Sequence, residues 1–349
     1  MRVAFLPHFP LNPYQRELAK ALGRIGANVT LPAERATPLE LLGKHGRFDV
    51  LHLHWLHDLV LAGRFRRLTA RKSSRFLAGL LAHKALGTRL AWTIHNVVEH
   101  ERRDPEAELL VYRALAHVLD VMFVHCDRAA EEVTRAYRIS AKNERKLRVI
   151  RHAHYADVYA SAIDRREARA RLGYEDEDVV FLHFGQLRPY KDVPALFSAF
   201  GRLESPRARL LLVGRAPKDE TLALPSDSRI RAITSFVPDG EVALYFRAAD
   251  VAVLPFARVL TSGSLVLAMS FGLPVITPSL GCIPETVPLR GGFSYVDERE
   301  LAPLMARMVD ADRKSMGAEN LRAALATSFD DMARKTDDGY RGVKNPRSW

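Results

Sequence analysis

Cysteine is scarce in this sequence of 349 residues, and long apolar runs are missing. The two cysteines, Cys126 and Cys282, lie far apart without metal-ligand spacing, which argues against a disulfide-rich scaffold and a cysteine-rich zinc site. No apolar run approaches the roughly 20 residues that a membrane-spanning helix needs. Residues 1–7 have the pattern of a strand rather than of a signal peptide. These features favour a reducing, cytoplasmic compartment.

Acidic residues are absent from residues 59–98 and are outnumbered throughout the first half of the chain. The net charge is +11, and its distribution is uneven. Residues 1–158 carry 26 Lys and Arg against 16 Asp and Glu, whereas residues 159–349 carry 26 against 25. A positive excess confined to one half predicts an anionic partner for that half: nucleic acid, a membrane surface or an acidic ligand.

The segment without acidic residues has the pattern of a basic amphipathic helix. Such a helix can lie on an anionic bilayer with its apolar side at the headgroup boundary. The alternative is a core helix with a solvated basic face, and the uneven charge of the two halves favours the membrane. The side chains expected to contact the membrane or an anionic acceptor are Arg64, Arg66, Arg67, Arg71, Lys72 and Arg75.

Short apolar runs alternate with helical stretches along the whole chain. This alternation predicts an α/β protein whose parallel sheets are covered by helices on both faces. The pattern restarts near Val179, after a charged segment, so we place a domain boundary near residues 155–165. The expected strands are Val3–Leu6, Asp49–His54, Leu90–Ile94, Val121–His125, Val179–Phe184, Leu210–Val213, Val251–Leu254 and Pro274–Ile276.

Two motifs in the second half have the chemistry of an anion site. Gly185 ends a strand, where a glycine lets a ligand approach the backbone. Arg188 and Lys191 follow in the next turn, where both can reach one diphosphate. An arginine can donate two parallel hydrogen bonds to phosphate oxygens, and a lysine adds a compact positive charge. Thr261–Ser264 opens a helix, whose free N–H groups and dipole bind phosphate. A solvated turn and an ordinary helix cap are the respective alternatives.

Histidines gather at two expected strand ends in the first half: His52, His54 and His57 at one, and His95 at the other. Strand carboxyl ends are where open α/β sheets bind ligands. A zinc site is conceivable, but strand alternation puts His52 and His54 on one face, where packing in the core is the simpler interpretation. We therefore predict no metal site.

Taken together, these motifs resemble those of the GT-B glycosyltransferases of bacterial exopolysaccharide assembly. The first half matches less tightly, chiefly at Asp49–Trp55 and Trp92–His100. The segments that carry the resemblance are Gly185–Lys191, Val213–Arg215, Phe236–Asp239, Ala249–Pro255, Thr261–Ser264 and Phe271–Val275.

The resemblance implies two Rossmann-like domains with a cleft between them. Residues 1–158 would form an acceptor-binding, membrane-associated domain, residues 159–325 a nucleotide-sugar-binding domain, and residues 326–349 a helix returning to the first domain. The donor diphosphate would be held by Gly185, Arg188, Lys191, Thr261, Ser262, Gly263 and Ser264. The nucleobase would lie beside Phe236, Val237 and Pro238.

One departure from the family pattern bears on stereochemistry. Many retaining relatives carry two glutamates eight positions apart, where this sequence has Val259 and Leu267. Neither side chain accepts a hydrogen bond or bears charge, which favours inversion. An inverting transfer needs a base beside the acceptor hydroxyl. The catalytic candidates are Asp58 first, then Glu99 and Glu101, with His95 near the donor sugar.

The resemblance implies transfer of mannose from GDP-mannose, with inversion to a β-linkage, onto a polyprenyl-diphosphate oligosaccharide, as in xanthan synthesis. Neither a cofactor nor a metal is expected, and the location would be the cytoplasmic face of the inner membrane, held peripherally. A retaining α-glycosyltransferase using a GDP- or UDP-sugar is the nearest alternative. A sugar-nucleotide epimerase, an inactive scaffold and a basic nucleic-acid-binding protein are the others, although no nucleic-acid motif is present.

Overall fold

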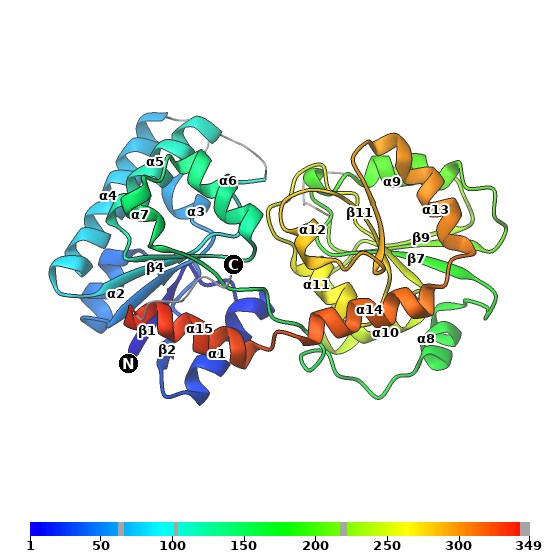
Figure 1. Cartoon of the computed structure of the whole chain (residues 1–349), viewed down its shortest axis with the longest axis horizontal. Coiled ribbons are helices and arrows are strands. Elements are labelled where there is room, and N and C mark those ends of the chain that lie inside the picture. The colour runs from blue at the N-terminus through cyan, green and yellow to red at the C-terminus, as the bar shows by residue number, and fades with distance from the viewer. Residues whose placement is uncertain (62–65, 101–103, 217–221, 343–349) are drawn as a thin grey trace. The chain divides into compact units, whose positions relative to one another are not determined.

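The computed structural model describes residues 1–61, 66–100, 104–216 and 222–342, without the side chains of Arg66 and Arg67. The chain divides into two compact units (Figure 1). The first comprises Met1–His152 with the chain from Thr327 onward, and the second comprises Ala153–Ala326. Residues 153–158 therefore belong to the second unit, not to the first as the sequence suggested. The backbone N–H of Tyr155 donates to Ser270 Oγ at 2.9 Å, which fixes this segment there.

The first unit contains a six-stranded, wholly parallel sheet in the order β2-β1-β3-β4-β5-β6. Its strands are β1 Arg2–Leu6, β2 Asn28–Thr30, β3 Val50–Leu53, β4 Arg89–Thr93, β5 Val121–Val124 and β6 Leu147–Val149. Its helices are α1 Pro13–Arg24, α2 Pro38–His45, α3 His57–Val60, α4 Arg66–Ala85, α5 Pro105–Val118, α6 Asp127–Tyr137, α7 Ala141–Glu144 and α15 Phe329–Arg341.

The second unit also contains a six-stranded, wholly parallel sheet, but with a different order of strands, β12-β11-β10-β7-β8-β9. Its strands are β7 Val179–Phe184, β8 Ala208–Val213, β9 Ile230–Ile233, β10 Val251–Val253, β11 Val275–Pro278 and β12 Gly292–Tyr295. Its α-helices are α8 Arg165–Leu172, α9 Val193–Gly201, α10 Val242–Ala248, α11 Gly263–Ser270, α12 Ile283–Thr286, α13 Leu301–Val309 and α14 Arg313–Leu325. Short 3₁₀ turns cover Pro189–Lys191, Asp239–Glu241 and Glu298–Glu300.

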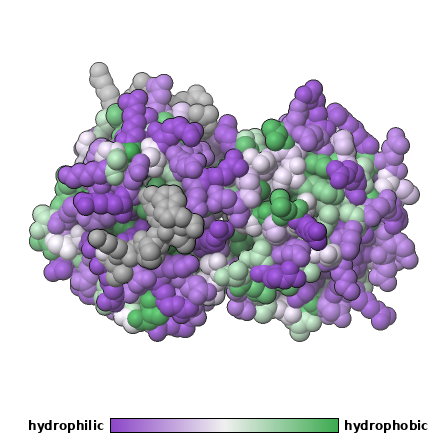
Figure 2. Space-filling view, in the orientation of Figure 1, coloured by the Kyte–Doolittle hydropathy of each residue, from purple (hydrophilic) through white to green (hydrophobic). Residues whose placement is uncertain are grey.

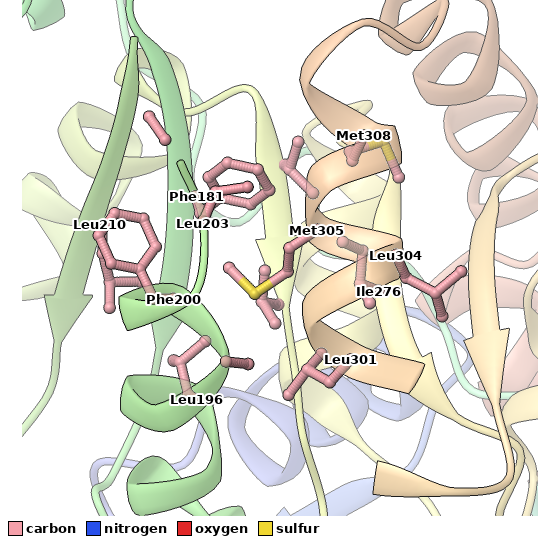
Figure 3. Packing of buried hydrophobic residues seen from close by; sticks show 14 of the residues in the cluster. Phe181, Leu196, Phe200, Leu203, Leu210, Ile276, Leu301, Leu304, Met305 and Met308 are labelled. Carbon is pink, nitrogen blue, oxygen red and sulfur yellow. The ribbon is translucent and has the colours of Figure 1, made fainter. Parts of the chain in front are cut away.

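Helices cover both faces of each sheet, as the alternating pattern predicts (Figure 1). In the second unit, α9 and α13 pack together over one face (Figure 3). Phe181 and Leu210 point from the sheet into this layer, where they meet Phe200 of α9 and Met305 of α13. All four side chains are fully buried. Burial of an apolar side chain of this size contributes roughly 2–3 kcal/mol, so this layer is a main source of the unit's stability.

The last helix of the chain belongs to the first unit, where the red α15 lies along the blue α1 (Figure 1). Ser328 caps α15 in a reciprocal pair with Asp331, and Gly342 ends it in the left-handed region. Tyr340, on the buried face of α15, brings its hydroxyl to 2.5 Å from Nδ1 of His52. A polar contact inside the core thus fixes the docking of this helix.

None of the helices within the described ranges is long and apolar enough to cross a bilayer. The face drawn in Figure 2 is mostly hydrophilic, and its apolar residues lie in separate patches.

A buried ion pair ties α8 to the sheet of the second unit. The guanidinium of Arg169 is 2% exposed, and its Nη2 lies 2.5 Å from Asp250 Oδ2. The same carboxylate accepts the backbone N–H of Val180 at 2.8 Å. Arg169 also donates to the carbonyl oxygen of Asp178 at 2.9 Å. The acidic residue that precedes β10 is therefore part of the architecture of this unit.

We predict that Asp250→Asn lowers the free energy of unfolding by roughly 3 kcal/mol, because it leaves the buried Arg169 charge without its counter-ion. Urea titration followed by circular dichroism measures this loss. Asp310→Asn is the matched control, because its partner Arg207 lies on the surface and such pairs contribute less than about 1 kcal/mol. Equal losses in the free energy of unfolding for the two substitutions would show that the buried pair contributes no more to stability than the surface pair.

Candidate functional site

The carboxyl edge of the second sheet is shaped by two glycines that approach each other. Gly185 follows β7 with φ of 123°, and Gly214 follows β8 with φ of 153°. A Cβ atom on Gly214 would lie 1.8 Å from the carbonyl oxygen of Gly185, and one on Gly185 would lie 2.5 Å from Lys191 Nζ. Both positions therefore require glycine, which lets the loops after β7 and β8 approach each other closely.

Lys191 brings a positive charge into this edge. The side chain is buried, and its ammonium donates to Ser264 Oγ at 3.1 Å and to the carbonyl oxygen of Phe184 at 3.4 Å, with the Phe256 ring centroid 5.9 Å away. No carboxylate within the described residues forms an ion pair with it. Burial lowers the pKa of Lys191 to about 8. A buried cation without a counter-ion in the protein is a typical feature of a binding site for an anion.

Lys191 and Ser264 meet where the order of the strands reverses. β7 pairs with β8 on one side and with β10 on the other, and open α/β sheets bind ligands at such a switch point. Ser264 lies in the first turn of α11, which begins at Gly263 after Ser262. The Ser262 hydroxyl accepts the N–H of Leu265 at 3.1 Å, so it serves as the helix cap. Residues 261–264 are half-buried, and the helix adds positive dipole character beside Lys191.

Arg188 and the segment Phe236–Pro238 flank this centre. Arg188 is exposed just before the 3₁₀ turn that carries Lys191, and its Nε lies 3.3 Å from Gln186 Oε1. Phe236 and Pro238 are exposed and Val237 is half-buried, after the edge strand β9. All the residues expected to bind the donor therefore follow carboxyl ends of strands of one sheet, and the closest contacts join Gly185, Lys191 and Ser264.

We predict that Lys191→Met stabilises the protein at neutral pH, because it removes the penalty of a buried charge. The folded-state pKa of about 8 lies below the ordinary value of 10.5, so the unfolded chain binds more protons between these pH values. The stability of the wild type therefore rises across that window. Urea titrations should give the variant a free energy of unfolding roughly 3 kcal/mol higher than that of the wild type at pH 7. This difference should shrink as the pH rises from 8 to 10.5.

Lys314→Met, at an exposed position of α14 in the same unit, is the control and should show no such pH dependence. A Lys191→Met variant that is less stable than the wild type at every pH would contradict the assignment of Lys191 as a strained cation.

In the first unit, the carboxyl edge of the sheet carries stacked aromatic rings. His95 follows β4, and its ring stacks on Trp55 with centroids 3.8 Å apart and planes 9° apart. Trp55 follows β3 and also meets Phe9, which follows β1, edge to face. Here too the order of the strands reverses between β1 and β3, and such a switch point is where open α/β sheets bind ligands.

The remaining predicted histidines have structural partners. His52 is buried between Tyr340 and the Thr93 hydroxyl, 2.8 Å from its Nε2, and burial lowers its pKa to about 3. His54 is buried behind His95, with its Nδ1 3.3 Å from His95 Nε2. Across the part of the chain that the structure describes, no three His, Cys, Asp or Glu side chains are placed to hold a metal ion.

The carboxylates expected as bases differ in access. Asp58 lies in α3, with its side chain 50% exposed and Oδ2 3.6 Å from His57 Nε2. Glu99 is buried, and its backbone N–H donates to Glu108 Oε2 at 2.8 Å. Glu101 lies outside the described residues. Asp58 is thus the accessible candidate at this edge.

The basic helix is observed as α4, and the predicted contact residues that can be described on it divide into two groups. Arg71 and Arg75 are exposed, with Leu68 and Leu81 each 52% exposed on the same helix. Lys72 instead donates to the carbonyl oxygens of Asp58, at 2.5 Å, and Leu61, at 2.9 Å, so it holds α3 against α4. Arg64 lies outside the described residues, as do the side chains of Arg66 and Arg67.

Two histidines at this edge escaped the sequence analysis. His125 follows β5 and His152 lies shortly after β6, with their rings 5.1 Å apart. Both rings also contact Tyr14 of α1. The signal was present, because His125 ends a predicted strand just as His54 does. A histidine at the end of each successive strand is the pattern that would have identified them.

Comparison with known sequences gives two kinds of relative. The family described as "Glycosyl transferases group 1" matches residues 178–311. The GDP-mannose:glycolipid 4-beta-D-mannosyltransferase of Xanthomonas campestris pv. campestris is 30% identical over 319 residues, which are 88% of this chain and 82% of that protein. The D-inositol 3-phosphate glycosyltransferase of Streptosporangium roseum is 26% identical, over 87% of this chain and 72% of that protein.

Comparison with solved structures shows the same architecture. The sucrose-phosphate synthase from Thermosynechococcus elongatus aligns with a TM-score of 0.76 at 19% identity, covering 98% of this chain and 99% of that one. Anabaena Alr3699/HepE, in complex with UDP-glucose, aligns with a TM-score of 0.73 at 15% identity, covering 98% of this chain and all of that one. These identities support a likeness of fold.

Proposed function

Because the chain belongs to the GT-B glycosyltransferases, we propose that it transfers mannose from GDP-mannose onto a polyprenyl-diphosphate-linked oligosaccharide in exopolysaccharide synthesis of the xanthan type. The observation that carries this proposal is the 30% identity to the Xanthomonas enzyme, over 88% of the chain. The name of that relative gives the donor, a glycolipid acceptor and a β-linkage.

In this proposal the second unit binds the sugar nucleotide. Lys191 and Arg188 neutralise the diphosphate, and the N-terminus of α11 adds N–H donors through Gly263 and Ser264. As the bond between the anomeric carbon and the phosphate oxygen breaks, negative charge develops on the departing GDP. Groups already placed at that oxygen stabilise the transition state without a metal ion. The guanine ring of the nucleotide lies beside Phe236–Pro238, next to the end of β9.

Inversion requires attack from the face opposite the leaving diphosphate. The acceptor hydroxyl loses its proton to a base while its oxygen bonds to the anomeric carbon. Asp58 suits this role because it is exposed at the carboxyl edge of the first sheet. Val259 and Leu267 stand where retaining relatives carry glutamates, and Leu267 is buried in α11. Their chemistry gives the second unit no nucleophile or base at these two positions.

We predict that the purified protein binds GDP more tightly than UDP in the presence of a chelator. Arg188→Ala should weaken GDP binding roughly 10- to 100-fold, because a charge-assisted hydrogen bond is worth about 1.5–3 kcal/mol. Isothermal titration calorimetry measures both effects. Arg202→Ala, at an exposed position just after α9, is the matched control and should leave the dissociation constant unchanged.

Preference for UDP would remove the mannosyltransferase assignment and keep the fold. Loss of binding on chelation would overturn the metal-independent diphosphate site. NMR of the product bond then decides the anomer, since an α-linkage would contradict inversion.

The polyprenyl acceptor lies in a bilayer, and we propose that α4 holds the enzyme against the anionic inner leaflet. Arg71 and Arg75 are exposed on that helix, and so are Leu68 and Leu81. Charges near the surface and apolar side chains at the headgroup boundary act together in peripheral binding.

We predict that Arg71→Gln combined with Arg75→Gln lowers the affinity for phosphatidylglycerol vesicles roughly 30-fold, at about 1 kcal/mol for each charge. Vesicle sedimentation at low and high salt measures the effect. The control pair is Arg166→Gln with Arg202→Gln, both exposed in the second unit. Equal binding by the two double variants would contradict docking through α4.

A further inference from the structure

His54 and His95 form a pair of buried rings at the carboxyl edge of the first sheet. His54 is fully buried after β3, and His95 is 6% exposed after β4. Nδ1 of His54 lies 3.3 Å from Nε2 of His95, and Trp55 covers the His95 ring at 3.8 Å. The position of the His95 ring is therefore set by the hydrogen bond to His54, the stacking contact with Trp55 and an edge-to-face contact with Tyr14, whose ring centroid lies 4.9 Å away.

Both histidines are neutral at physiological pH. Burial lowers the pKa of His54 and of His95 well below the ordinary value, and the neighbouring histidines add to this effect. A neutral imidazole carries one proton, on either ring nitrogen. The hydrogen bond between the two rings thus holds a single proton, donated either by His54 Nδ1 or by His95 Nε2.

The other nitrogen of His54 decides between these two arrangements. Nε2 of His54 is buried and has no hydrogen-bond partner within the described residues. If His95 were the donor, His54 would have to carry its own proton on Nε2, as a buried N–H without an acceptor. Such a donor costs roughly 1–3 kcal/mol, and orphaned buried N–H groups are rarer than bare acceptors. His54 therefore carries its proton on Nδ1 and donates it to His95.

Two further buried histidines show the same arrangement with an unambiguous partner. His125 donates from Nδ1 to the carbonyl oxygen of Ile150 at 2.8 Å, and His183 donates from Nδ1 to that of Val253 at 2.9 Å. A carbonyl only accepts, so both protons lie on Nδ1. In both rings Nε2 is buried without a partner among the described residues, as it is in His54.

We propose that His54 is a positioning residue that fixes His95 in the tautomer with its proton on Nδ1, so that His95 offers a hydrogen-bond donor and not a general base. No group of the described chain takes the hydrogen bond from His95 Nδ1. This part of the proposal rests on the proposed function. The partner of His95 Nδ1–H is then an oxygen atom of the donor or acceptor substrate, either a sugar hydroxyl or a phosphate oxygen. Proton removal from the acceptor is then left to a carboxylate such as Asp58.

The tautomer is measured directly by long-range ¹H–¹⁵N correlation NMR on protein labelled at the histidine ring nitrogens. His125 and His183 serve as internal references for the Nδ1–H form, and the His95 signal is assigned by its loss in His95→Asn. The wild type should show His95 with its proton on Nδ1. A proton on His95 Nε2 would overturn the proposal whatever reaction the protein catalyses.

The role of His54 is tested in the same spectra. His54→Phe keeps an aromatic ring and removes the donor, so His95 should shift toward the Nε2–H form. Tyr340→Phe is the matched control, because it removes a hydrogen bond to His52 in the same cluster and leaves the His54–His95 pair intact. An unchanged His95 tautomer in folded His54→Phe would contradict the positioning role.

Kinetics test the consequence for catalysis. The amide of His95→Asn places an N–H close to the position of Nδ1, whereas His95→Ala has none. The kcat/KM of His95→Asn should be at least about tenfold higher than that of His95→Ala, because a difference of this size corresponds to one hydrogen bond. Equal loss in both would exclude the donor role. Affinities for mannose and for GDP in the two variants show whether the sugar or the phosphate is the partner.

Discussion

Parallel strand pairing is the constraint on which the rest of this structure depends. A parallel sheet needs a crossover after each strand, so every strand ends at the same edge and its next residues gather there. In the second unit this brings together Gly185, Lys191 and Ser264 from loops far apart in sequence. In the first unit it places a histidine or an aromatic ring after each of several strands. Both candidate sites follow from this one geometric rule.

The two edges use burial in opposite ways. In the second unit, burial without a carboxylate partner among the described residues lowers the pKa of Lys191 to about 8, which suits the anion site that we propose there. In the first unit, burial keeps His54 and His95 uncharged, so their protons are directed by hydrogen bonds rather than by pH. One sheet edge thus presents a buried cation, and the other presents neutral imidazole rings, of which we propose His95 as a hydrogen-bond donor.

The eight strands predicted from the sequence are all observed, and the four that it missed are β2, β6, β9 and β12. These four are the edge strands of the two sheets. A central strand is covered on both faces and reads as a continuous apolar run, whereas an edge strand is short and half-buried. The segment Asn28–Thr30 therefore has no apolar run to reveal it. Pairing with a neighbour, which composition does not encode, makes it a strand.

The sequence by itself determined the α/β class, the repeat of one plan in two halves, and the glycines and basic residues of the second sheet's edge, because strand periodicity and loop chemistry are local. The division of roles among similar side chains was decided only by tertiary structure. Lys72 holds two backbone carbonyls while Arg71 is exposed, and His52 docks α15 while His54 supports His95. Residues close together in the sequence can have the same side-chain chemistry. The burial of each side chain and its nearest partner then decide its structural role.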